Sequence, residues 1–226
     1  MLTFAAVLPA AFLLHYIYQH DTVEKEPVSL LIRILVFGMI ATIPTSLMEG
    51  LLGYALGIFV NTESRWYHFL HMFFVVALVE EYWKRWAARK VWNHPAFNYR
   101  FDAVVYCVSA ALGFAALENV LYVMTGGLAT AMLRAFTAVP SHAIDGVIMG
   151  CFFGEAKLRE RLGDERGKRK YLRLSLWIPA IAHGIYDYSL VSDWEYAGLF
   201  FVLFVVCVDI WAVRYIRRAS QQDMPL

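Results

Sequence analysis

Long apolar runs alternate with short polar segments along the whole chain, and this alternation is its clearest pattern. A helix of about 20 apolar residues is long enough to cross the roughly 30 Å hydrocarbon core of a bilayer. The pattern therefore predicts an all-α, polytopic transmembrane helix bundle of about seven spans. The predicted spans are residues 2–19, 30–48, 67–83, 101–124, 135–153, 174–190 and 197–213.

Two stretches of the chain do not fit a simple alternation of spans and loops. Residues 49–62 are apolar but carry Glu49 and three glycines after Pro44, so they either extend the second helix, kink it or form a re-entrant segment. Residues 1–20 lack a basic start and a small-residue cleavage site, so we expect a retained first helix rather than a removed signal peptide.

The basic residues predict an orientation. If the loops alternate sides, one side holds 18 of the 20 Lys and Arg residues, in residues 20–33, 84–100, 154–173 and the tail from Arg214. The other side, in residues 61–66, 125–134 and 191–196, holds only Arg65 and Arg134. Since basic loops stay in the cytoplasm, we expect the N-terminus outside, the C-terminus inside, and a multi-pass protein of the cell membrane.

Composition supports the membrane interpretation and narrows the partners. The 226 residues are 60% hydrophobic and 17% charged, which is too apolar for an ordinary soluble domain and predicts one integral membrane domain over residues 1–226. A net charge of +1 gives no indication of nucleic-acid binding. The three cysteines lie in apolar segments without paired spacing, so no disulfide framework or thiolate zinc site is predicted.

Four predicted spans carry ionisable side chains in their interior. Such groups are costly in hydrocarbon and usually line a polar cavity with a function. We therefore expect them to converge on one hydrated chamber, where acid and imidazole groups together suggest hydrolysis. The candidates are Glu80, Glu81, Glu118, His142, Asp145, His183 and Asp187.

The spacing of these groups allows ordinary structural explanations as well. Glu80 and Glu81 precede Lys84 by four and three residues, which is the usual geometry of ion pairs on a helix, but one carboxylate can still face a cavity. Glu118 and Asn119 lack a basic neighbour within a turn and could join two helices by hydrogen bonds.

Two imidazoles are each followed by a carboxylate on the same helix face. Asp145 follows His142 by three residues, and Asp187 follows His183 by four. In each pair the acid can fix the tautomer of the ring. A single buried histidine is usually structural, but two such pairs beside two acidic spans favour a site.

Taken together, these motifs resemble those of the PrsW family of intramembrane proteases, which is related to the CAAX-processing and bacteriocin-processing membrane proteases. The resemblance covers about residues 65–190. The matching elements are Glu80-Glu81-x-x-Lys84, Phe114-x-x-x-Glu118-Asn119, His142 followed by Gly146 and Gly150, and His183-x-x-x-Asp187.

The resemblance implies endoproteolysis of a membrane-anchored regulator, with site-1 cleavage of an anti-sigma factor as the family's best known role. The expected partners are then a single-span membrane protein substrate and the lipid bilayer. Asp187 is a departure, because related families often carry asparagine or another small polar residue there. Its role as a ligand of water or as a support of His183 stays open.

Two mechanisms are compatible with these residues. In the first, Glu80 or Glu81 activates water without a cofactor, while His142 and His183 orient it or stabilise the oxyanion. Glu118 and Asn119 complete the polar wall in this version, which the resemblance favours.

The second mechanism uses zinc. Glu118, His142 and His183 would then be the metal ligands, and one of the adjacent glutamates would be the base. No HExxH helix supports this version.

A single site also has to satisfy a depth requirement. From the predicted boundaries, Glu118, His142 and Asp187 lie toward the outer leaflet and Glu80 lies nearer the inner one. The third helix must therefore continue toward Trp92 or tilt if these groups are to meet.

A proton- or ion-coupled transporter is the rival interpretation, because it would place the same acids and histidines inside a bundle. Transporters of this kind tend to have two matching halves with broken helices, and the interruption at residues 44–57 has no counterpart in the second half. A non-catalytic scaffold held together by polar contacts is a third alternative.

Overall fold

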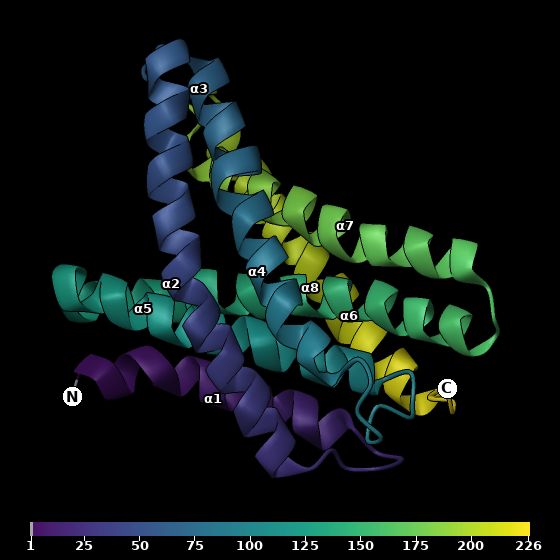
Figure 1. Ribbon diagram of the computed structural model, residues 1–226. Coiled ribbons are helices and arrows are strands. Elements are labelled where there is room, and N and C mark those ends of the chain that lie inside the picture. The colour runs from purple at the N-terminus through teal and green to yellow at the C-terminus, as the bar shows by residue number, and fades with distance from the viewer. Residues whose placement is uncertain (1) are drawn as a thin grey trace.

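The computed structural model describes residues 2–226, and within that range it is built from helices. Figure 1 shows α5 running through the centre, with α1 along one side and the α6–α7 pair along another. The helices are α1 (Leu2–His20), α2 (Val28–Phe59), α3 (Arg65–Leu70), the π-helix η1 (His71–Ala77), α4 (Leu78–Ala88), the short 3-10 helix η2 (Arg89–Val91), α5 (Asp102–Phe136), α6 (Ala138–Arg161), α7 (Glu165–Val191) and α8 (Ala197–Gln221).

Local sequence explains several helix ends. The Ser64 side chain accepts a hydrogen bond from the Tyr67 amide, and Asp164 does the same for Gly167, so each caps the helix that follows. Gly163 takes a positive φ of 73° between α6 and α7, where a side chain would be strained. The basic stretch predicted as a loop at 154–173 is therefore mostly helix, with a short turn joining α6 to α7.

The first half of α5 forms the core of the bundle. Its residues from Asp102 to Ala116 are all buried, and it contacts α1, α2, α4 and α6. Gly146 and Gly150 of α6 let the two backbones approach, because a Cβ at either position would lie within 2.8 Å of the α5 backbone. Small residues four apart are a common device for close helix packing in membranes.

The second predicted helix is longer than expected. α2 continues through Pro44 and the glycines to Phe59, so residues 49–62 mostly extend it. Among residues 2–226, four helical stretches are long and apolar enough to cross a membrane: Leu2–His20, Val28–Phe59, Asp102–Arg161 and Ala197–Gln221. The protein is thus an all-helical membrane protein, while the seven spans and their orientation stay predictions.

The third predicted span runs on as expected from the depth requirement. Helical structure continues almost without a break from Arg65 to Val91, through the π-helix, and places Glu80 at the start of α4. Residues 125–134, predicted as an outer loop, are instead helical apart from Gly127. Gly127 has φ 71° and ψ −162°, which breaks α5 at that point.

Candidate active site

The acid and imidazole groups of α4, α5, α6 and α7 meet around one cavity of about 500 Å³. Glu80, Glu118, His142, His183 and Asp187 all line it. Because these residues come from four helices, the cavity exists only in the folded bundle. The predicted convergence on a shared chamber is confirmed for these five residues, whereas Glu81 and Asp145 do not line the cavity.

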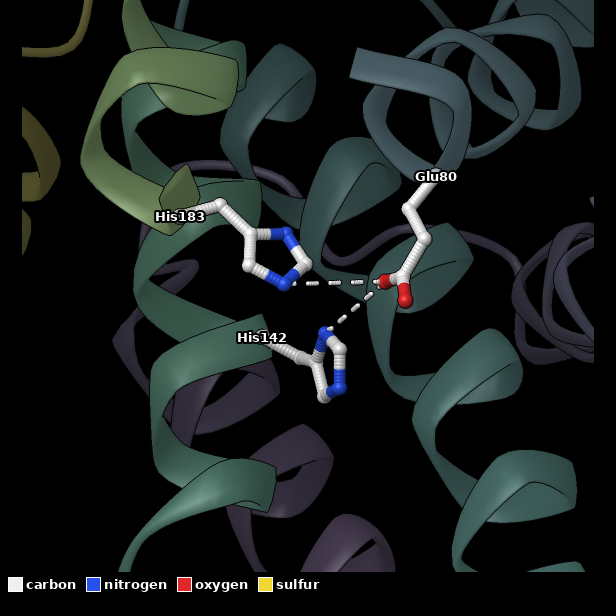
Figure 2. Close-up of side chains that lie close together, drawn as sticks. All are labelled: Glu80, His142 and His183. Carbon is white, nitrogen blue, oxygen red and sulfur yellow. Dashed lines mark ion pairs between the residues drawn. The ribbon is translucent and has the colours of Figure 1, made fainter. Parts of the chain in front are cut away.

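Glu80 faces both imidazoles, as Figure 2 shows. Its Oε2 atom lies 3.9 Å from His142 Nδ1 and 3.8 Å from His183 Nε2. All three side chains are at most 6% exposed. The same oxygen lies 3.0 Å from the Lys84 ammonium, so an ion pair holds the Glu80 carboxylate at the cavity wall.

Glu81 does not line the cavity and instead contacts Lys84 and His183. Its Oε1 atom lies 2.6 Å from Lys84 Nζ and 3.0 Å from His183 Nδ1, and the side chain is fully buried. The two neighbouring carboxylates therefore face different surroundings, because successive helical side chains point about 100° apart.

Lys84 is a buried ammonium group at the centre of these contacts. Besides Glu81, it lies 3.0 Å from Glu80 Oε2 and 2.8 Å from His142 Nδ1. The predicted ion pairs with both glutamates are thus confirmed. Since a lysine ammonium can only donate, His142 Nδ1 is the acceptor in this contact, and the ring proton is assigned to Nε2.

The remaining carboxylates divide between the two imidazoles. His142 Nε2 lies 3.0 Å from Glu118, while His183 Nε2 lies 3.2 Å from Asp187. The predicted pairing of His183 with Asp187 is confirmed. The predicted pairing of His142 with Asp145 is wrong, because Asp145 lies beside His183 instead, with 3.7 Å between its Oδ2 and the ring Nδ1.

Asn119 does not belong to the polar wall of the cavity. It is fully buried, donates to the Ala6 carbonyl of α1 at 2.7 Å and accepts from Arg134 at 2.8 Å. Its direct role is to join α1 and the end of α5 to the helix that carries Glu118, as the alternative of a polar helix contact predicts.

Two of the charged residues that line the cavity escaped prediction. Glu49 lines the cavity from α2, and Arg134 lines it from the end of α5 and pairs with Glu118 at 2.6 Å. A lone acid in an apolar stretch is the signal that could have identified Glu49. Nothing in the sequence places Arg134 there, because its position depends on the break at Gly127.

Two groups of side chains have the composition of a metal site. Glu80, His142 and His183 offer ligand atoms within 4.8 Å of one another, as do Glu81, Asp145 and His183. Glu118 belongs to neither group, so the predicted zinc ligands do not lie together as a set. Two imidazoles and one carboxylate are a usual donor set for zinc.

The contacts of these donors nevertheless do not fit a bound metal. The His142 Nδ1 lone pair is taken by the Lys84 ammonium, and both nitrogens of His183 face carboxylates, Glu81 and Asp187. A metal would have to displace a fully buried cation and free a second nitrogen. As arranged, His142 faces an ammonium group and His183 lies between two carboxylates.

Membrane helices that bring carboxylates and imidazoles to a shared polar cavity are the arrangement expected of an intramembrane hydrolase. Comparison with known proteins gives the family. The model described as "PrsW family intramembrane metalloprotease" matches residues 26–213. The chain therefore belongs to the PrsW family of intramembrane proteases.

Curated relatives match over nearly the full chain. It is 35% identical to Protease PrsW of Oceanobacillus iheyensis, covering 97% of this chain and 96% of the relative. Identity is also 35% to Protease PrsW of Geobacillus kaustophilus, over 98% and 93% of the two chains. For Protease PrsW of Bacillus subtilis it is 34%, over 89% and 88%. No solved structure matches.

Proposed function

We propose that this chain is an endopeptidase that cuts single-span, membrane-anchored regulatory proteins, with Glu80 as the general base. The observation that carries the proposal is the position of Glu80 on the cavity wall, facing His142 and His183 at 3.9 and 3.8 Å. An anti-sigma factor is the substrate class that the family resemblance suggests.

Glu80 would take a proton from water, and the resulting hydroxide would add to the carbonyl carbon of the peptide bond. His142 would support this step indirectly, because its Nδ1 atom contacts the Lys84 ammonium that lies beside Glu80, while Glu118 holds its Nε2 atom. Glu81 is a positioning residue here, because it touches Lys84 and His183 but does not line the cavity.

His183 would protonate the leaving amine as the carbon–nitrogen bond breaks. Its two nitrogens each face a carboxylate, which favours a ring that carries both protons and can give one up. The proton that Glu80 took from water then passes to His183, which restores both residues to their starting states without a further reagent. The buried Lys84 and the partly exposed Arg134 offset the negative charge of the cavity.

The family description implies a metal ion, but the engaged nitrogens and Lys84 support direct activation of water by Glu80. The transporter alternative has no support, because the relatives quoted above are all called proteases. Cleavage and metal dependence are separate questions, and they need separate experiments.

The proposal is tested by reconstituting the protein in liposomes with a single-span reporter protein. We expect wild type to cut the reporter at one peptide bond, with one oxygen from labelled water in the new carboxylate. We expect the Glu80→Gln and His183→Ala variants to leave it intact. Equal cleavage by wild type and both variants would contradict the proposal, as would proton-driven uptake without cleavage.

A further inference from the structure

The end of α5 folds back on itself after Gly127. Arg134 contacts Glu118 and Asn119, which precede it by 16 and 15 residues. In a straight helix, residues so far apart in sequence would be separated by roughly 24 Å. The contact therefore requires the chain to reverse at Gly127, and we call residues 128–136 the fold-back segment.

Arg134 is held by three groups of the preceding helix. Its Nη2 atom donates to Glu118 Oε2 at 2.6 Å and its Nε atom donates to Asn119 Oδ1 at 2.8 Å. The guanidinium also lies 4.1 Å from the centre of the Tyr122 ring. With only 15% of the side chain exposed, these contacts fix the guanidinium more firmly than a surface ion pair would.

The same oxygen of Glu118 connects Arg134 to His142 in the candidate active site. Glu118 Oε2 accepts from Arg134 and lies 3.0 Å from His142 Nε2. On the other side of the ring, His142 Nδ1 faces Lys84. A carboxylate that stays ionised and in place keeps the ring proton on Nε2, so the Nδ1 lone pair remains directed toward Lys84 and Glu80.

We propose that Arg134 is a positioning residue of the candidate active site. It acts through Glu118 to fix the orientation and tautomer of His142. The fold-back segment is then part of the active site rather than a connecting loop. Without Arg134, the Glu118 carboxylate loses its shortest contact and no longer holds the ring. The catalytic consequence rests on the proposed function, while the effect on His142 does not.

The catalytic consequence is tested by a double-mutant cycle with Arg134→Gln, Glu118→Gln and the combined variant. Loss of a group that orients a catalytic side chain typically lowers activity about 10–100-fold. We therefore expect Arg134→Gln to lower kcat by that order, with little change in KM. We expect the combined variant to be no slower than the slower single variant, because both changes break the same chain of contacts. Multiplying effects would overturn the proposal.

Two further variants separate positioning from general damage. Arg134→Lys keeps the charge but not the forked geometry, so we expect it to restore part of the lost rate. Arg65→Gln is the matched control, because Arg65 also pairs with an acid, Asp193, but with 74% and 67% of the two side chains exposed. We expect its rate to equal that of wild type. An equal loss in Arg65→Gln would contradict a specific role of Arg134.

The effect on His142 is measured directly by nitrogen NMR of the histidine rings, with His142→Gln used to assign the signals. We expect wild type to show a single tautomer at His142 and Arg134→Gln to show a mixture, whether or not any substrate is cut. An unchanged His142 spectrum in Arg134→Gln would refute the positioning role. Absence of cleavage by wild type would instead refute the proposed function.

Discussion

Replacing each of the two adjacent glutamates by glutamine should affect stability differently. Glu80 lines the cavity, and its shortest contact is with Lys84 at 3.0 Å, while His142 and His183 lie farther away, at 3.9 and 3.8 Å. Glu81 is fully buried and contacts both Lys84 at 2.6 Å and His183 at 3.0 Å. We therefore expect Glu80→Gln to remove activity with little loss of stability, and Glu81→Gln to lower stability.

The contacts set the expected magnitudes. In Glu80→Gln, Lys84 keeps Glu81 and His142 as partners, while loss of a general base costs about 10²–10⁴-fold in rate. In Glu81→Gln, the buried ammonium loses its shortest contact, and removing one partner of a buried ion pair typically costs about 3–5 kcal/mol. Activity should also fall in Glu81→Gln, because His183 loses its Nδ1 partner.

Cleavage of the single-span reporter and thermal unfolding in detergent measure the two effects on the same preparations. Glu195→Gln is a matched control, because Glu195 is exposed, and it should change neither quantity. The reasoning fails if Glu81→Gln unfolds at the temperature of wild type, or if Glu80→Gln retains full activity.

Three other outcomes follow from the structure. Because the Lys84 ammonium occupies the lone pair of His142 Nδ1, we expect chelators to leave cleavage intact and the purified protein to hold far less than one metal ion per chain. One zinc ion per chain that is required for activity would overturn this prediction. Burial raises the pKa of Asp21 to about 6 and that of Glu26 to about 9. Both groups bind their protons more tightly in the folded state, so their contribution to stability is complete below pH 4 and is lost as pH rises through these values. The melting temperature should fall less steeply with pH in Glu26→Gln, and an unchanged slope would refute this. Gly150→Leu should disturb the packing of α6 on α5 and lower the free energy of unfolding by at least about 1–3 kcal/mol. Gly198→Leu is the control, because a side chain at Gly198 meets open space, and equal unfolding temperatures of the two variants would contradict the prediction.

The helices and most of the site residues could be predicted from local features. Apolar runs identify helices suited to a membrane wherever they occur, because hydrocarbon accepts only chains that satisfy their own backbone hydrogen bonds. An ionised group within such a run is expensive enough to indicate a site, and this identified Glu80, Glu118, His142 and His183. The pairing of His183 with Asp187 was also predictable, since it needs only helix geometry.

Contacts between helices were decided by the tertiary structure. From the sequence alone, Glu80 and Glu81 are equally suitable as the general base. Only the packing of α4 places Glu80 at the cavity and Glu81 against His183 Nδ1. The partner of His142 is Glu118 rather than Asp145 for the same reason. Arg134 reaches the site because Gly127 reverses the chain. Side-chain chemistry and helical periodicity are local properties, whereas the direction of a side chain relative to other helices depends on how the whole bundle packs.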